Sequence, residues 1–361
     1  MVVIIFEIDM NQQPESPHGR GAASNPANRF ELLTVESEPD PDNEGRTVPT
    51  QLFRERSRAI IAHNDSPDIG FSASINPYRG CEHGCVYCYA RPTHEYLGWS
   101  AGLDFETKIV VKEDAPVLLR KELSSPRWEP QVIALSGVTD CYQPVERKLR
   151  LTRGCLEVLA DFRNPVGIVT KNRLVCRDID LLQELARHDA AVVFVSLSTL
   201  DDELAARLEP RATRPAGRLA AISELAKAGV PVGVLTAPVI PGLTDHELPA
   251  LLRAAADAGA TSAGFVLLRL PHGVGPLFDD WLQRHYPQRR DKVLSRIRET
   301  RGGQLSDPRF GSRMRGEGPI AKQIHDLFAL GCRRAGIMGR RPPLSTAAFR
   351  RPGVVQRLLF E

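Results

Sequence analysis

The chain has 361 residues, of which 42% are hydrophobic and 25% are charged, as in an ordinary globular protein with room for one large domain. No apolar run approaches the roughly 20 residues that a membrane helix needs, and the apolar start MVVIIFEIDM has no basic leader, so we expect neither a membrane protein nor a secreted one. The seven cysteines are odd in number and three are clustered, which argues against a disulfide framework and favours the cytoplasm.

The first part of the chain is polar. Residues 10 to 66 are rich in Pro, Asn, Ser, Arg and Glu and show little hydrophobic periodicity. Such a composition does not provide enough apolar surface for a core of its own. We therefore predict that the segment 1–66 is disordered or wrapped over the surface of the rest.

Short apolar runs alternate with amphipathic helical patterns after residue 66. Most of the runs are nearly continuous in apolar residues, which is typical of parallel strands covered on both faces. Six β/α units predict an α/β protein whose core, residues 67–271, is a parallel (β/α)6 partial barrel, with a doubly wound open sheet as the alternative. The strand candidates are 70–76, 131–138, 166–171, 191–198, 230–240 and 263–270, and the helical patterns lie near 114–124, 145–161, 178–187, 216–228 and 245–258.

Polar side chains stand at the end of each predicted strand. In both architectures the carboxyl ends of parallel strands meet at one edge, where the chemistry of such proteins gathers. A cysteine-containing loop follows the first strand, and the segment APVIPGLTD ends the fifth. We expect all six ends to face one opening. The other strand-end residues are Thr139, Asp140, Lys171, Ser196, Ser198, Arg269 and His272.

The loop NPYRGCEHGCVYCYARPTHEYLG, residues 76–98, holds Cys81, Cys85 and Cys88 in the spacing C-x3-C-x2-C. Three thiolates can bind three corners of an iron–sulfur cubane or three positions around zinc. A structural zinc site normally has four protein ligands, and His83, two residues from both Cys81 and Cys85, is poorly placed to be the fourth. A [4Fe–4S] cluster ordinarily has four cysteine ligands, so three leave one iron open for a substrate or cofactor.

This motif, directly after a first strand and with Tyr87 before the last cysteine, resembles the radical S-adenosylmethionine (SAM) superfamily. The resemblance implies a [4Fe–4S] cluster on the three cysteines, with SAM bound to the open iron through its amino and carboxylate groups. It also implies an enzyme in which one electron cleaves SAM to methionine and a 5′-deoxyadenosyl radical. An external reductant such as ferredoxin or flavodoxin is implied as well, because the sequence has no flavin or nicotinamide motif.

Further segments are similar to the spore photoproduct lyase group and its relatives: SGVTDCYQPVE, IVTKNRLVCRDIDLL, FVSLST and LEPRATRPAGRLAAISELAKAGVPVGVLTAPVIPG. The segments GRGAASNPANRFE and RFGSRMRGEGPIAKQI look like an uncharacterised bacterial branch of that set. The resemblance assigns Lys171 to the SAM carboxylate, Thr139 or Asp140 to the methionyl amino group, Ser196 to the ribose, and Tyr87 to a cover over the cluster or adenine. Each position also has a structural explanation, such as a strand-end lysine or a Thr-Asp helix cap.

Two positions decide how far that resemblance extends. The lyase has a cysteine three residues before the aspartate, and this cysteine donates a hydrogen atom to the product radical. Gly137 stands there in this chain, and Cys141 lies on the other side of Asp140. Cys141 could replace the missing donor if the loop curls back, although a buried structural cysteine is the more frequent case. Arg218 matches the lyase pattern in a region where substrate contact and pairing with a carboxylate are both open.

The C-terminal region is strongly basic. Residues 271–361 hold 18 Lys and Arg against 8 Asp and Glu, a balance of +10, whereas the remaining residues have a balance of −7. We predict an Arg-rich helical extension over 272–361, which either binds nucleic acid or folds back on the acidic body. Its segment WLQRHYPQRR, residues 281–290, could stack on a base and grip phosphate, or form an amphipathic helix with Trp281 and Leu282 inward.

The sequence therefore predicts a radical SAM enzyme that abstracts hydrogen from an unknown substrate, with nucleic acid as the first substrate class and a metabolite or peptide as the second. The Gly137 departure argues against spore photoproduct lyase activity itself. The alternative is a non-catalytic iron–sulfur protein that senses redox state and binds nucleic acid. A sensor would need neither the open iron nor the convergence of Lys171 and Ser196 on the cysteine loop.

Overall fold

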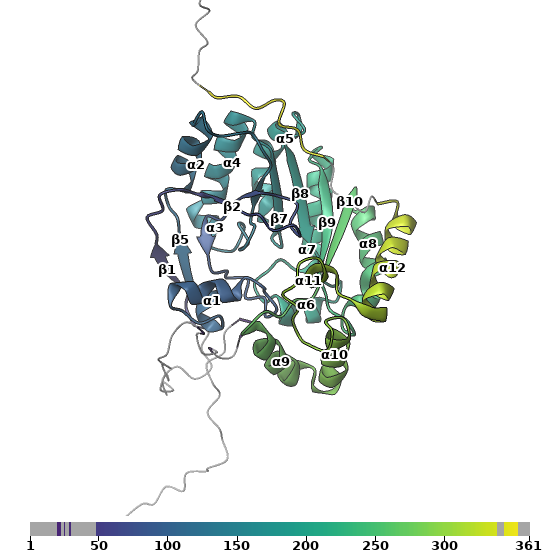
Figure 1. Ribbon diagram of the computed structural model, residues 1–361. Coiled ribbons are helices and arrows are strands. Elements are labelled where there is room, and N and C mark those ends of the chain that lie inside the picture. Colours follow the sequence, from purple (N-terminus) through teal and green to yellow (C-terminus); the bar gives the residue numbers. More distant parts are fainter. Residues whose placement is uncertain (1–19, 23–24, 26–28, 30–47, 338–342, 353–361) are drawn as a thin grey trace, which may run out of the picture.

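The structure is a computed structural model that describes residues 20–22, 25, 29, 48–337 and 343–352 (Figure 1). Most of the predicted polar segment 1–66 lies outside the described residues. No helix in the described part of the chain is long and apolar enough to cross a membrane.

A sheet of six parallel strands and one antiparallel edge strand forms the centre of the molecule. The six parallel strands are adjacent in chain order, whereas a doubly wound sheet reverses its strand order at a switch point. The predicted (β/α)6 partial barrel is therefore confirmed, and all six predicted strands are present (Figure 1). They are β3 (Ala73–Ile75), β6 (Ile133–Leu135), β7 (Val166–Thr170), β8 (Ala191–Ser196), β9 (Val232–Val239) and β10 (Ser262–Leu267).

Helices cover the outer face of this sheet. The run AVVFVS of β8 is buried at five of its six positions, because the outer helices cover one face and the barrel interior encloses the other. One hydrophobic core contains residues of the strands and of the helices, such as Ile168 of β7 and Leu156 of α4. The outer helices are α2 (Ala115–Ser124), α4 (Leu151–Phe162), α5 (Ile179–Ala186), α7 (Pro215–Lys227) and α8 (Leu248–Asp257).

The helix predicted near 145–161 is two helices, α3 (Glu146–Leu149) and α4. Arg150 between them has φ 54°, a left-handed conformation that interrupts a right-handed helix. Another helix, α6 (Asp202–Leu208), had no counterpart in the prediction. It begins where the side chain of Asp201 accepts hydrogen bonds from the backbone N–H groups of Glu203 and Leu204.

A small second sheet flanks the cysteine loop. Its strands are β1 (Gln51–Arg54), β5 (Lys108–Val111) and β4 (Tyr78–Arg79), in the order β1-β5-β4. The short helix α1 (Leu103–Thr107) leads into β5, and β2 (Ile61–His63) pairs antiparallel with β3. Strands β1 and β2 belong to the segment 1–66, so its described part is tied to strands of the core.

The described part of the C-terminal region contains four helices, which are α9 (Val274–His285), α10 (Pro287–Glu299), α11 (Ser312–Arg315) and α12 (Gly318–Ala335). Trp281 and Leu282 are fully buried, and the indole N–H of Trp281 donates to the carbonyl of Arg207 at 3.0 Å. The inward placement of Trp281 and Leu282 is thus confirmed, and Trp281 is not available to stack on a base, but residues 281–290 are not one helix, because α9 ends at His285 and α10 begins at Pro287. Phe278 and Trp281 share a hydrophobic core with Val86 of the cysteine loop.

Many arginines of this region bind other parts of the same chain. Arg290 pairs with Asp279 at 2.6 Å, and Arg313 pairs with Asp68 at 2.5 Å. Arg351 donates to the carbonyls of Ser125 and Trp128. Some of these arginines therefore pair with acidic groups of the barrel or of the extension itself.

Candidate active site

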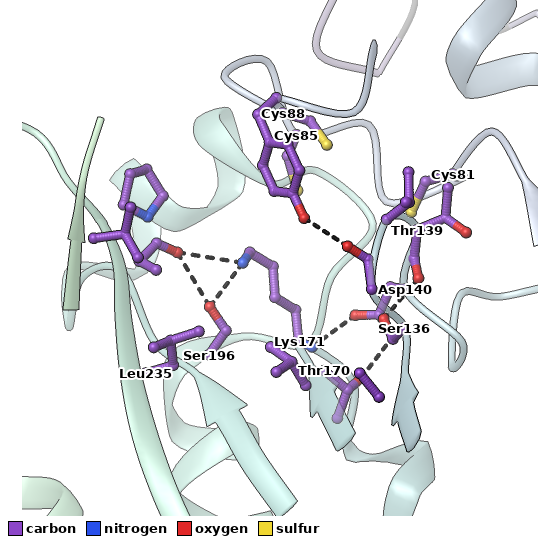
Figure 2. A pocket seen from close by; sticks show the side chains of 18 of the residues that line it. Cys81, Cys85, Cys88, Ser136, Thr139, Asp140, Thr170, Lys171, Ser196 and Leu235 are labelled. Carbon is purple, nitrogen blue, oxygen red and sulfur yellow. Dashed lines mark hydrogen bonds between the residues drawn. The ribbon is translucent and has the colours of Figure 1, made fainter. Parts of the chain in front are cut away.

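A cavity of about 560 Å³ lies at the carboxyl ends of the parallel strands. Its size is within the range of about 300–1,000 Å³ of pockets that bind drug-sized ligands. Figure 2 shows the three cysteines on one side of it and Lys171 and Ser196 on the other. Of the nine site residues predicted from the sequence, the cavity wall includes eight: Cys81, Cys85, Cys88, Tyr87, Thr139, Asp140, Lys171 and Ser196.

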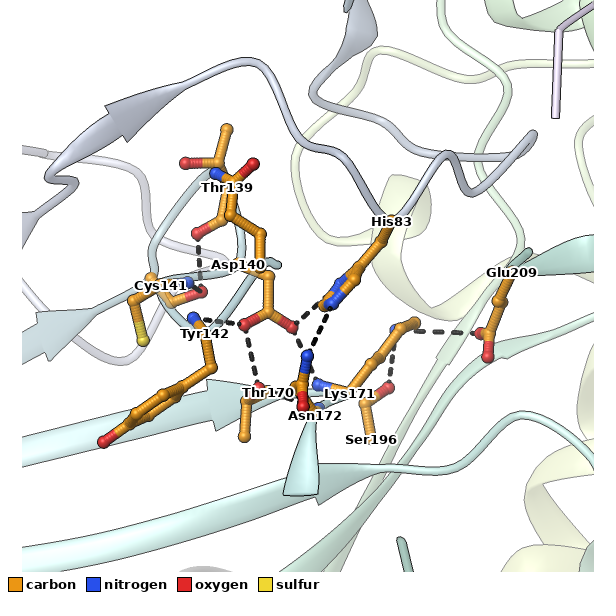
Figure 3. Close-up of polar contacts among 12 residues, drawn as sticks. His83, Thr139, Asp140, Cys141, Tyr142, Thr170, Lys171, Asn172, Ser196 and Glu209 are labelled. Carbon is orange, nitrogen blue, oxygen red and sulfur yellow. Dashed lines mark hydrogen bonds and ion pairs between the residues drawn. The ribbon is translucent and has the colours of Figure 1, made fainter. Parts of the chain in front are cut away.

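Cys141, the ninth, lies elsewhere. Its side chain is fully buried in the hydrophobic core and is not part of the cavity wall. In Figure 3 its thiol points away from His83 and Lys171. Burial also raises the pKa of this thiol well above its usual range, as does the nearby charge of Asp140. The placement is that of a structural cysteine.

The cysteine loop is held in shape by its backbone and by two glycines. The N–H of Cys81 donates to the carbonyl of Phe105 at 2.9 Å, and that of Cys88 to the carbonyl of Cys85 at 3.2 Å. Gly80 and Gly84 have φ 78° and 66°, the left-handed region that favours glycine. The loop therefore directs three thiols to one cavity.

A buried ion pair supports the loop from behind. Arg91 donates to the carbonyl of Cys85 at 3.0 Å and pairs with Glu106 at 2.5 Å, and both side chains are fully buried. The same carboxylate accepts the backbone N–H of Gly21 at 3.1 Å. A Cβ on Gly21 would lie 2.0 Å from the carbonyl oxygen of Gly84, so the two backbones are in the closest contact that glycine allows.

Asp140 joins three elements at the cavity wall (Figure 3). Its carboxylate accepts the hydroxyl of Thr170 at 2.8 Å and the backbone N–H groups of Lys171 and Tyr142 at 2.8 and 2.9 Å. Nδ1 of His83, in the cysteine loop, lies 3.4 Å from it. Burial opposes the charge on Asp140, but His83 and these hydrogen bonds outweigh it and lower the pKa to about 2. Asp140 is therefore an anion that fixes the loop relative to β6 and β7.

Lys171 reaches into the cavity from the end of β7. Its ammonium donates to the hydroxyl of Ser196 at 2.7 Å, and that hydroxyl donates to the carbonyl of Ala237 at 3.1 Å. Nζ also lies 5.9 Å from the ring centre of Tyr87 and 3.9 Å from the carboxylate of Glu209. Figures 2 and 3 show Lys171 and Ser196 pointing toward each other. A positive charge held this way faces the three thiols.

Glu209 is the site residue that the sequence did not single out. Its buried carboxylate accepts hydrogen bonds from Tyr87, from Ser198 at 2.9 Å, and from Arg218, with which it forms an ion pair. Burial opposes its charge, but Arg218 and Lys171 outweigh burial and lower the pKa of Glu209 to about 2. For Arg218, the structure shows pairing with a carboxylate, one of the two roles left open by the sequence.

Thr139 completes the wall beside Asp140. Its hydroxyl donates to the carbonyl of Tyr78 at 2.8 Å, and its own carbonyl accepts from Ser136 at 2.6 Å. The Thr139 side chain therefore holds β4 and the end of β6 together. Its hydroxyl oxygen still has acceptor capacity toward the cavity.

The donor set fits a cubane cluster. Thiolates are the ligands of iron–sulfur clusters, and each cysteine of such a cluster binds a different iron. Three cysteine thiols line one wall of a single cavity here. Within the described residues, no group of three His, Cys, Asp or Glu side chains is placed to hold one single metal ion.

The fold and this site are those of an enzyme that generates radicals from SAM. The Radical SAM superfamily model matches residues 75–255, half of the chain. This protein belongs to the radical SAM superfamily and is an enzyme of radical chemistry. Enzymes of this superfamily carry a [4Fe–4S] cluster, bind SAM and take their electron from an external reductant.

Two curated relatives are of note. "Uncharacterized protein Rv2578c" of Mycobacterium tuberculosis is 40% identical over 284 residues, which cover 78% of this chain and 80% of that protein. "Radical SAM Nalpha-GlyT isomerase" of Pseudomonas phage M6 is 24% identical over 192 residues, which cover 51% of this chain and 38% of that protein.

Solved structures of spore photoproduct lyase share the fold. A complex with dinucleoside spore photoproduct has a TM-score of 0.56 and 17% identity, with 84% of this chain and 85% of that chain covered. A mutant of the lyase with bound AdoMet and the same ligand has a TM-score of 0.57 and 18% identity, with the same coverage. The predicted resemblance to this group is confirmed at the level of the fold.

Proposed function

We propose that the cavity binds a [4Fe–4S] cluster on Cys81, Cys85 and Cys88, with SAM beside it, and that a substrate loses a hydrogen atom there. When bound, the cluster supplies the single electron that divides SAM into methionine and a 5′-deoxyadenosyl radical, which abstracts hydrogen from the substrate. The observation that carries the proposal is that the three thiols of the cysteine loop and one lysine from the distant end of β7 line the same cavity.

The chain's own residues bind and orient SAM. Lys171 offers an ammonium to the SAM carboxylate, because its hydrogen bonds to the hydroxyl of Ser196 and to the carbonyl of Ala237 at 3.4 Å use two of its three N–H donors, and the carboxylate of Glu209 lies no closer than 3.9 Å. Ser196 and Thr139 offer hydroxyl oxygens to the ribose and to the methionyl amino group. Asp140 acts indirectly. Its carboxylate accepts the backbone N–H of Lys171 and lies beside His83, so it fixes Lys171 relative to the cysteine loop.

Tyr87 and the C-terminal helices exclude water from the site. The hydroxyl of Tyr87 is held by Glu209, so its ring has a fixed orientation beside Lys171. Behind the loop, Val86 packs with Phe278 of α9. A dry, rigid wall limits side reactions of a radical.

The substrate we propose is a nucleic acid. The basic balance of residues 271–361 favours a polyanion, and the fold is shared with a lyase whose structures hold a dinucleoside photoproduct. Ferredoxin or flavodoxin is our candidate for the reductant. A reduced cluster and reduced thiols suit the cytoplasm, where we place the protein.

The proposal is tested by anaerobic reconstitution, reduction with dithionite and addition of SAM, with 5′-deoxyadenosine as the measured product. Cys85→Ala is the blank, and Cys176→Ala, which lies outside the cavity wall, is the matched control. We expect iron and 5′-deoxyadenosine in the wild type and in Cys176→Ala, and a loss of both in Cys85→Ala. Equal iron content in all three proteins would contradict the proposed ligands.

The substrate is tested separately with single-stranded oligonucleotides at increasing salt. A nucleic-acid substrate should bind more weakly as salt rises, because phosphate contacts release counterions. Stimulation of 5′-deoxyadenosine formation by an oligonucleotide would support the substrate class. Binding that does not depend on salt, or no stimulation by any oligonucleotide, would count against it.

A further inference from the structure

Arg269 stands out among the charged groups of the cavity wall. It follows β10 in the chain and lines the cavity. Its described contacts are the ring of Tyr89, 5.7 Å from its guanidinium, and the sulfur of Met314, 3.4 Å from Nη1. No carboxylate of the described residues is within ion-pair distance of it.

The neighbouring cations are all bound by partners of their own. Arg313 pairs with Asp68 at 2.5 Å and donates to Ser66 at 2.6 Å. Arg301 donates to four backbone carbonyls and so fastens the α11 segment to the end of β10. Lys171 has Glu209 nearby. Asp68, the nearest acidic group to Arg269, is occupied by Arg313 and by the N–H of Gly311 at 2.6 Å.

An unpaired guanidinium in a partly buried place is costly. A charge removed from water without a counter-charge destabilises the protein unless another group compensates it. Burial and the neighbouring charge of Arg313 lower the pKa of Arg269 by more than Tyr89 and Asp68 raise it, so its positive charge is only partly compensated by the chain. A bound anion would supply that compensation.

Two partly exposed side chains with apolar surface, those of Tyr89 and Val138, line the same cavity as Arg269. The ring of Tyr89 is 48% exposed, and its hydroxyl is fixed by a hydrogen bond of 2.9 Å to the carbonyl of Gly137. Val138, 37% exposed, lines the same cavity. A fixed aromatic ring next to a guanidinium suits a ligand that has both a planar part and an anionic group.

We infer that Arg269 binds an anionic oxygen group of the substrate, a phosphate or a carboxylate, while a planar part of the substrate lies over Tyr89. The inference rests on the proposed function, since it assigns the mouth of that same cavity to the substrate. The planar guanidinium can donate two parallel hydrogen bonds to either anion. Lys171 is the cation that binds the SAM carboxylate, so Arg269 is the cation that is left for the substrate.

The test uses three small probes on the reconstituted protein with SAM bound: phenyl phosphate, benzoate and phenol. Each has the same ring, and they differ in the anion. Dissociation constants are measured by ligand-observed NMR for the wild type, Arg269→Gln and Arg315→Gln. Arg315 is an exposed arginine of α11, so its change removes the same charge without altering the cavity wall.

We expect the wild type and Arg315→Gln to bind one anionic probe more tightly than phenol. In Arg269→Gln the ratio of the two dissociation constants should fall by about tenfold or more, the change in affinity expected when charge-assisted hydrogen bonds are lost. The preferred probe identifies the anion as phosphate or carboxylate. Equal affinity for all three probes in the wild type, or an unchanged preference in Arg269→Gln, would overturn the inference. So would a loss in Arg269→Gln of SAM affinity, measured by equilibrium dialysis, because Arg269 would then bind the cofactor. None of these titrations measures SAM cleavage, so they can fail while the proposed function stands.

Discussion

The change Glu209→Gln tests whether the buried charges around Lys171 form one unit. Glu209 and Arg218 have side-chain exposures of 1% and 2%, and the carboxylate also accepts from Tyr87 and Ser198. Gln keeps the shape and one acceptor oxygen but removes the negative charge. Arg218 then keeps its hydrogen bonds to the carbonyls of Ser196 and Thr213 and loses its counter-charge.

The expected loss of stability is large. Removing one partner of a buried ion pair costs about 3–5 kcal/mol, because the other charge stays buried without compensation. An exposed pair offers the comparison: Glu203 pairs with Arg207 on α6, with 72% of the Glu203 side chain exposed. For Glu203→Gln we expect a loss below about 1 kcal/mol.

Urea unfolding of the anaerobic, cluster-loaded protein measures both changes, with the unfolding midpoint and slope fitted together. The double change Glu209→Gln with Arg218→Met removes both charges, keeps an acceptor for Tyr87 and Ser198, and should recover part of the loss, because no buried charge is left without its partner. A loss below about 1 kcal/mol for Glu209→Gln would refute the reasoning, since a buried pair should cost more than an exposed one. A double variant no more stable than the single one would refute the charge argument and leave shape as the cause.

Three further predictions concern the cofactors and the loop. Lys171→Met should weaken SAM binding by about tenfold or more in equilibrium dialysis, because the carboxylate loses a charge-assisted hydrogen bond, and an unchanged affinity would rule out that role. Gly21→Ala should lower the iron content of the protein, because the added Cβ would lie 2.0 Å from the carbonyl oxygen of Gly84. Gly275→Ala is the control, since the nearest atom to its added Cβ is 3.8 Å away. Equal iron content in the two variants would contradict the predicted clash. Removing iron with a chelator should speed amide hydrogen exchange in residues 81–88 more than in the outer helices, and uniform exchange across the chain would show that the cluster does not order the loop.

The barrel was predictable because its signals are local. The continuous apolar runs of β7 and β8 identify them as buried strands, and polar residues mark where they end. Strands β2 and β4, of three and two residues, are too short to show any periodicity. They exist because β3 and β5 lie beside them, which no pattern within the short segments reveals.

The candidate site also has some features that the local sequence shows and others that only the folded chain creates. The spacing of three cysteines lies within eight residues, so the sequence shows it directly. The contact of Tyr87 with Glu209 joins residues 122 positions apart, and only the folded barrel brings them together. A glutamate before a proline, at 209–210, carries no local sign of that role. Arg218 could be noticed from a resemblance, but its partner could not.

Because α9 and the cysteine loop share a hydrophobic core, the barrel cannot be separated from the C-terminal extension without exposing the loop. Phe278 and Trp281 lie beyond the last strand of the barrel, yet they pack in one cluster with Val86 and Tyr87. A chain that stopped at residue 271 would leave the back of the loop open to solvent and to dissolved oxygen, which attacks exposed iron–sulfur clusters. The start of the basic extension therefore covers the back of the cysteine loop, and a variant that exchanges it for another domain has to replace that cover.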